Sequence, residues 1–214
     1  MMSPMPYPVS VSVEPLLSPR DRVTTAFRLI LAIPHVFLVG AIGFSLVFRT
    51  GRSNVVTIGP ETGLLGLIAA VMAIVSWFTI LLKHEHWPGV RGFTLFYLRW
   101  RVRALAYLML LEDRYPPLGD APYPASVTVI DPAGPRDLLS VGLRLLLAVP
   151  HFVALACLMA AWWIMTIVVW FVILATGHYP RGLHTFGVVC LRWLIRVEAY
   201  LLLLVDEYPP FSFD

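Results

Sequence analysis

The sequence predicts an all-α membrane protein of two tandem repeats, each with a short β-strand, a transmembrane helical hairpin and an amphipathic interfacial helix. Composition is the first reason. Of the 214 residues, 58% are hydrophobic and 14% are charged, whereas soluble domains have about 45–50% apolar and about 25% charged residues. Two further observations are the long apolar runs and the recurrence of the same motifs in the two halves of the chain.

Three apolar runs are candidates for crossing a bilayer, since crossing about 30 Å of hydrocarbon takes roughly 20 apolar residues. They are residues 27–48, 63–82 and 145–175. The last run has 31 residues, whereas two crossings need about 40. It therefore forms a full hairpin, a re-entrant hairpin or a single kinked span. The first half, where a polar insertion separates two runs, favours the hairpin and about four crossings in total.

An internal repeat follows from two shifts of the sequence. A shift of 116 residues places "FRLILAIPHV" on "LRLLLAVPHF", and a shift of 93 residues places "RYPP" on "EYPP". The difference of 23 residues (116 − 93) is an insertion in the first copy. We therefore assign a first repeat to residues 7–117, with an inserted loop at about 47–63, and a second repeat to residues 123–210.

Each repeat begins with a predicted strand and ends with a predicted third helix. The segments "VSVSV" and "ASVTV" alternate with a period of two, which is typical of a β-strand; the sequence leaves open whether the two strands pair. The third helix contains "LRWRVRALAYL" or "LRWLIRVEAYL". A central arginine in a transmembrane helix costs at least about 2.5–3.5 kcal/mol, so we expect both third helices to lie in the membrane interface.

The charge distribution predicts the orientation. Fourteen of the 16 basic residues flank the apolar runs on one side, and only Arg49 and Arg52 lie in the loop between the first two runs. The positive-inside rule makes the basic side cytoplasmic. We therefore expect a multi-pass protein whose two repeats lie parallel and whose termini are both cytoplasmic.

The repeated Arg–His motif is the main candidate site. Arg28 and His35 are seven residues apart and so share one helix face, and Arg144 and His151 repeat this spacing. The pair could hold a lipid head group, or it could anchor the helix at the interface, which is favoured because both residues lie near the boundary. The candidate head-group residues are Arg28, His35, Arg144, His151, Arg99, Arg103, Tyr107, Arg192, Arg196 and Tyr200.

Motifs for catalysis are missing from the sequence. It has no G-x-S-x-G, Walker or H-E-x-x-H pattern, and no acidic residue within an apolar run. We therefore expect no catalytic residues, metal or cofactor. Two functions remain: a non-enzymatic accessory or scaffold subunit of a larger membrane complex, such as one in envelope lipid transport, or an anionic-lipid-binding or lipid-transport protein. The expected partners are anionic membrane lipids and a larger membrane complex, with no nucleic acid.

Several motifs resemble those of a bacterial membrane family known as domain of unknown function 4389. They are "LAIPH", "WFVILATGHYPRG" and "LRWLIRVEAYLLLLVDEYPPF". Residues 123–212 resemble the family nearly end to end, whereas the first copy departs from it in "KHEHWPGVRG" and in the insertion. The resemblance implies a small multi-pass protein of a bacterial inner membrane, and it implies no activity.

Overall fold

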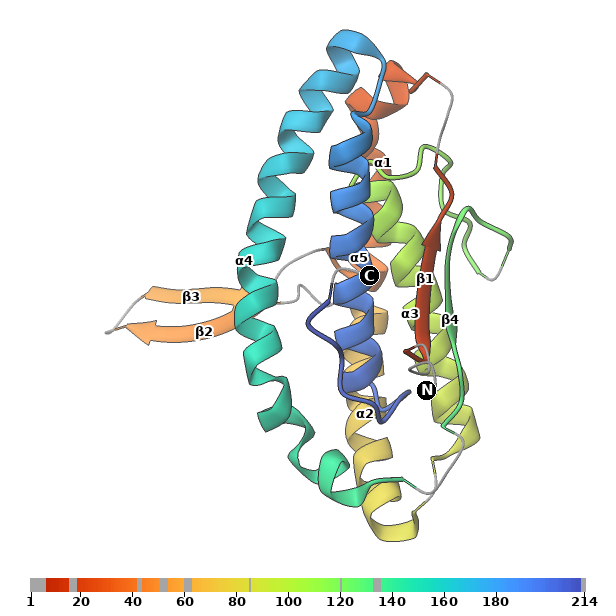
Figure 1. The fold of residues 1–214 in the computed structure, drawn as a ribbon, viewed down its shortest axis with the longest axis vertical. Coiled ribbons are helices and arrows are strands. Elements are labelled where there is room, and N and C mark those ends of the chain that lie inside the picture. Colours follow the sequence, from red (N-terminus) through yellow and green to blue (C-terminus); the bar gives the residue numbers. More distant parts are fainter. Residues whose placement is uncertain are drawn as a thin grey trace, which may run out of the picture.

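The computed structural model describes residues 7–15, 19–41, 44–50, 54–59, 63–84, 86–119, 121–132 and 136–212. The elements in chain order are β1 (Val9–Val13), α1 (Arg22–Val39), β2 (Phe44–Thr50), β3 (Asn54–Gly59), α2 (Leu64–Lys83), α3 (Pro88–Leu108), β4 (Ala125–Val129), α4 (Leu138–Thr176) and α5 (Arg181–Leu201). They form three layers, with α3 and α5 between the long helices α1, α2 and α4 and a two-stranded β1–β4 sheet (Figure 1).

The second repeat contains one long helix in place of the predicted hairpin. Helix α4 begins after Asp137, whose side chain accepts a hydrogen bond from the Leu139 N–H, and it ends at Gly177 with a φ of 74°. Its 39 residues span about 58 Å. The hairpin over residues 145–175 is therefore wrong, and a single helix with Pro150 inside it forms instead. Nothing between Leu145 and Ala175 supplies a turn sequence that would end the helix.

The first repeat has no helical hairpin either, because α1 and α2 lie end to end along α4. The Trp170 Nε1–H donates to the Thr25 carbonyl over 2.9 Å, and the Trp77 Nε1–H donates to the Val141 carbonyl over 2.9 Å. Positions 141 and 170 are 29 residues apart on α4, or about 44 Å. The start of α1 and the end of α2 therefore lie at opposite ends of α4, whereas a hairpin would bring them together.

The junction between α1 and α2 carries the insertion. Gly63 precedes α2 so close to α1 that a side chain there would overlap the backbone of Leu38 and Gly40. Strands β2 and β3 pair as an antiparallel hairpin, with Thr50 opposite Asn54, and the hairpin projects beyond α4 (Figure 1). The predicted loop at about 47–63 is thus partly strand, and its residues 51–53 and 60–62 lie outside the described part of the chain.

The pairing of β1 with β4 shows how the repeats are oriented. The strands are antiparallel, and Val11 lies opposite Val127, its equivalent at the shift of 116 residues. Ser12 lies opposite Ser126, and Ser10 lies opposite Thr128. At the shift of 116 residues Ser12 is equivalent to Thr128 and Ser10 to Ser126, so exchanging the two repeats turns one pair into the other. Such self-complementary pairing is the mark of a local two-fold axis. The equivalent strands of the two repeats therefore run antiparallel to each other about this axis. The predicted parallel orientation of the repeats relative to a membrane stays a prediction.

Helices α3 and α5 form the core of the protein, whereas the sequence predicts surface helices whose arginines reach lipid phosphates. Leu98 and Leu105 on α3 and Ile195 on α5 are fully buried. The two helices pack on each other, β4 covers α3 and β1 covers α5. The arginines of these helices need not reach phosphates, because Arg101 and Arg103 are buried and hydrogen-bonded within the protein.

Membrane-like surface is confined to the outer helices. Helices α1, α2 and α4 are long and apolar enough to cross a membrane by length and composition. Their positions agree with the three predicted apolar runs, except that residues 44–48 belong to β2. This is the composition of a membrane protein, with its charged residues kept largely off the outer helices.

The strand register predicts a specific cross-link. Ser12 and Ser126 are exposed, and their Oγ atoms are 2.9 Å apart. With Cys157 replaced by Ala, the pair Ser12→Cys and Ser126→Cys should form an intramolecular disulfide on mild oxidation, seen as a mobility change on a non-reducing gel. The pair Ser12→Cys and Thr128→Cys is the control, because Cβ atoms on a diagonal of about 7–8 Å are too far apart to bridge. Equal cross-linking of both pairs would contradict the register.

Candidate functional site: two arginine anchors and an asymmetric groove

The C-termini of α3 and α5 end inside the protein in matching turns. Leu110 follows α3 with a φ of 64°, and Leu203 follows α5 with a φ of 61°. A helix leaves its last four carbonyls without partners inside the helix. The turns themselves pair most of them: at α3 the N–H groups of Met109, Leu110 and Leu111 donate to carbonyls of the last turn, and the N–H groups of residues 202–204 do the same at α5. Buried carbonyls of the turns that follow need further donors.

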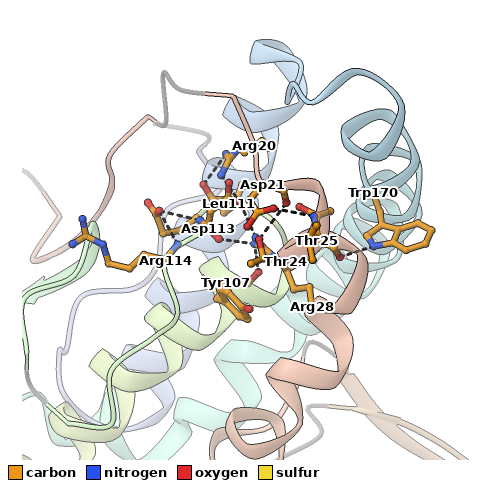
Figure 2. Close-up of polar contacts among 12 residues, drawn as sticks. Arg20, Asp21, Thr24, Thr25, Arg28, Tyr107, Leu111, Asp113, Arg114 and Trp170 are labelled. Atoms are coloured by element: carbon orange, nitrogen blue, oxygen red, sulfur yellow. Dashed lines mark hydrogen bonds and ion pairs between the residues drawn. The ribbon is translucent and has the colours of Figure 1, made fainter.

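Arg28 adds side-chain donors at the end of α3 and in the turn after it, an arrangement that we call the first arginine anchor (Figure 2). Its guanidinium, 1% exposed, donates to the carbonyls of Tyr107 over 3.0 Å and Glu112 over 2.6 Å, and to the Asp113 carboxylate over 2.6 Å. It also lies 4.5 Å from the centre of the Tyr107 ring. Arg20 completes the anchor, 3.0 Å from Asp113. The cation therefore closes the end of α3 and neutralises a partly buried acid.

The second arginine anchor repeats this arrangement at α5. Arg144 donates to the carbonyls of Tyr200 over 2.7 Å and Val205 over 3.0 Å, and to the Asp206 carboxylate over 2.9 Å. It lies 4.3 Å from the centre of the Tyr200 ring. Arg136 takes the place of Arg20, 2.6 Å from Asp206. The motif therefore recurs because each repeat has a third helix whose buried end it closes.

The histidines of the motif hold the third helices from the side. The Trp100 Nε1–H donates to His35 Nδ1 over 3.1 Å, and the Trp193 Nε1–H donates to His151 Nδ1 over 3.3 Å. Both histidines are at most 1% exposed. The structure thus places the Arg and His of each motif on the same face, as predicted, and directs both toward the third helix of their own repeat.

The remaining predicted head-group residues fall into two groups. Arg103 donates to the Gly119 carbonyl and Arg196 lies 5.4 Å from the centre of the Tyr7 ring, so both contact other parts of the fold. Arg99 and Arg192 are half-buried, and among the described residues no hydrogen bond or ion pair engages them. Head-group binding stays a prediction for the whole set, and these two arginines are the most available for it.

A groove between α2 and α4 is the largest feature that the sequence did not predict. It comprises a cavity of about 490 Å³ and an adjoining cavity of about 130 Å³. The two cavities share Ala70, Phe152, Leu201 and Leu202 in their walls. The larger one is lined almost entirely by apolar side chains, whereas Tyr97, Arg101 and Glu198 line the smaller one.

Small residues on α2 create this groove. Gly66, Ala70 and Ala73 line it, and Ala69 is buried beside them. At the shift of 93 residues the equivalent positions on α4 are Met159, Trp163, Thr166 and Trp162. The space that large side chains occupy in one half of the molecule is therefore open in the other half.

The polar end of the groove is also specific to one half. The Arg101 Nε–H donates to both carboxylate oxygens of Glu198, over 2.7 and 2.8 Å. The equivalent positions in the other repeat are Leu194 and Leu105. Burial raises the pKa of the Glu198 carboxyl, an effect that Arg101 opposes. Burial also raises the pKa of Tyr97 to about 12, so its hydroxyl remains a hydrogen-bond donor.

Both features of the groove were detectable as departures from the internal repeat. The alignment of the repeats places Ala70 against Trp163 and Glu198 against Leu105. The arginine anchors lie at positions that are the same in both repeats, whereas the groove lies at positions where the repeats differ. Among the described residues, no cluster of three His, Cys, Asp or Glu side chains is suited to a metal ion.

The arginine anchors predict a stability pattern. Arg28→Met and Arg144→Met should each lower the free energy of unfolding by about 3–5 kcal/mol, because they take a charged donor from a partly buried carboxylate and from a carbonyl of the turn after the helix. Arg99→Met, on a half-buried arginine without a partner, should change it by about 0.5 kcal/mol or less. Denaturant unfolding in detergent micelles measures the three variants. Equal losses for Arg99→Met and Arg28→Met would contradict the anchor.

The ion pair in the groove predicts a different pattern. Arg101→Leu and Glu198→Leu alone should each cost about 3–5 kcal/mol, because each leaves a buried charge unpaired. The double variant, which copies Leu194 and Leu105 of the other repeat, should regain most of that stability, since apolar replacements of buried ion pairs are often neutral or stabilising. Unfolding of the four proteins forms a double-mutant cycle. Additive losses would show that the two charges do not depend on each other.

Comparison with known proteins identifies the family. The sequence pattern of the family described as domain of unknown function 4389 matches residues 56–118 and 139–212, together more than half of the chain, in two segments consistent with a tandem duplication. No curated protein and no solved structure matches. The chain therefore belongs to the family of domain of unknown function 4389.

Proposed function

We propose that this protein is a non-enzymatic membrane protein that binds one lipid molecule in the groove between α2 and α4. The observation that carries the proposal is the position of the groove, where the two repeats differ both in size and in polarity of their side chains. Its larger cavity of about 490 Å³ lies within the range of about 300–1,000 Å³ typical of small-molecule sites. An apolar cavity with one polar end suits an amphipathic ligand.

The walls of the groove indicate how the lipid would be held. The apolar chain would occupy the larger cavity, between Ala73, Phe78 and Phe152. The polar group would approach Tyr97, Arg101 and Glu198 at the smaller cavity. Because Arg101 and Glu198 neutralise each other, this end favours an uncharged, hydrogen-bonding group such as a hydroxyl or an amide. An anionic head group, as expected from the sequence, would instead require a partner such as Arg99 or Arg192.

The other function that the sequence favours, an accessory subunit of a larger membrane complex, stays a prediction. Purification from the native membrane in mild detergent separates the two hypotheses. A stoichiometric membrane partner supports the accessory role, and a bound lipid on the isolated chain supports the groove.

The test fills the groove. Ala70→Trp, which introduces the residue type found at the equivalent position 163, should lower the amount of co-purified lipid roughly tenfold, a change of about 1.4 kcal/mol in binding. Native mass spectrometry of the detergent-purified protein measures lipid occupancy. Ala160→Trp is the matched control, since Ala160 is exposed on α4 and does not line the groove. Undiminished lipid on the Ala70→Trp protein, with folding intact, would disprove the proposal.

A further inference from the structure

We infer that the protein lies flat on one face of a bilayer, with α1, α2 and α4 embedded in lipid and the β1–β4 sheet facing water. In this orientation the long axis of the molecule is parallel to the membrane plane. Three features of the structure support it over an upright orientation, in which α4 would cross the membrane along its length.

The first feature is the distribution of exposed apolar side chains. Among the described residues 31 large hydrophobic side chains are exposed, and 25 of them lie on α1, α2 and α4. None lies on α3, α5, β1 or β4. On the opposite face of the molecule the exposed side chains of the sheet are the hydroxyls of Ser10, Ser12, Ser126 and Thr128. One face therefore suits hydrocarbon, and the other suits water.

The second feature is length. The exposed face of α4 stays apolar from Leu139 to Phe171, a distance of about 48 Å over 32 residues at 1.5 Å per residue. The hydrocarbon core is about 30 Å thick. An upright α4 would leave about 18 Å of this face in water, and fitting all of it would take a tilt of about 50°, beyond the usual range of 0–40°. A flat orientation buries the whole face.

The third feature is charge. The N–H of Arg20 donates to the Gly177 carbonyl over 2.8 Å, so the start of α1 and the end of α4 meet at one end of the molecule. The basic residues at this end include Arg20, Arg22, Arg114 and Arg181, and those at the other end include Lys83, Arg91 and Arg136. An upright orientation would place at least three basic residues on each side of the membrane, contrary to the asymmetry that the positive-inside rule describes. The flat orientation places all seven on one side.

Sidedness of the two ends is the first test. Arg22→Cys, Lys83→Cys and Ser10→Cys each place a single exposed thiol, with Cys157 replaced by Ala and Cys190 buried. A membrane-impermeant maleimide is applied to right-side-out and to inverted vesicles of the expressing membrane. The flat orientation requires all three thiols to react from the same side. Reaction of Arg22→Cys and Lys83→Cys from opposite sides would overturn it.

Membrane depth is the second test, and it uses a thiol already in place. Cys157 is exposed on α4, and Leu143 and Phe171 lie 14 residues before and after it on the same exposed face, about 21 Å away in each direction. Spin labels at Cys157 and, with Cys157 replaced by Ala, at Leu143→Cys or Phe171→Cys report depth through collision with oxygen and with a nickel chelate. Equal depths support the flat orientation. A deep label at 157 between two shallow ones would overturn it.

Discussion

The structure depends on the need to satisfy the carbonyls at the buried ends of two central helices. Helices α3 and α5 end inside the protein, where the N–H groups of the following turns pair with most of the last helix carbonyls. The carbonyls of the turns themselves still need donors, and an unpaired buried carbonyl costs about 1–3 kcal/mol. Arg28 and Arg144 reach these ends from α1 and α4 and bring Asp113 and Asp206 with them. A charge that would be costly in lipid is thereby placed within the protein, and the outer helices are left free to be apolar.

Contacts between the repeats also occur in equivalent pairs. Tyr7 donates to the Glu207 carbonyl, and Tyr123, its equivalent, donates to the Arg114 carbonyl. Trp77 of the first repeat donates to a carbonyl in the first turn of α4, and its equivalent Trp170 donates to a carbonyl in the first turn of α1. Each repeat thus completes the other, as the two subunits of a symmetric dimer do. Because every such contact occurs twice, the two-fold arrangement is set by several independent pairs.

Asymmetry arises where only one repeat has changed. The insertion in the first repeat separates α1 from α2, whereas α4 is continuous. Alanine and glycine on α2 replace the bulky residues of α4, and a buried ion pair replaces two leucines. These changes meet at the α2–α4 groove. A duplicated chain can therefore keep its structural contacts in both halves while the remaining positions change in one half, without loss of the fold.

The sequence by itself determined the apolar character of the protein, the repeat, the two strands and the three apolar runs, because these depend on local composition and period. It also identified the Arg–His motif as important. It did not determine that α4 is one continuous helix, that β1 and β4 pair antiparallel, or that Arg28 points inward. Those outcomes depend on partners far along the chain, such as Asp113 for Arg28 and Glu198 for Arg101. Only the tertiary structure decided them, because a charged side chain can be buried only where the fold places an oppositely charged or hydrogen-bonding partner beside it.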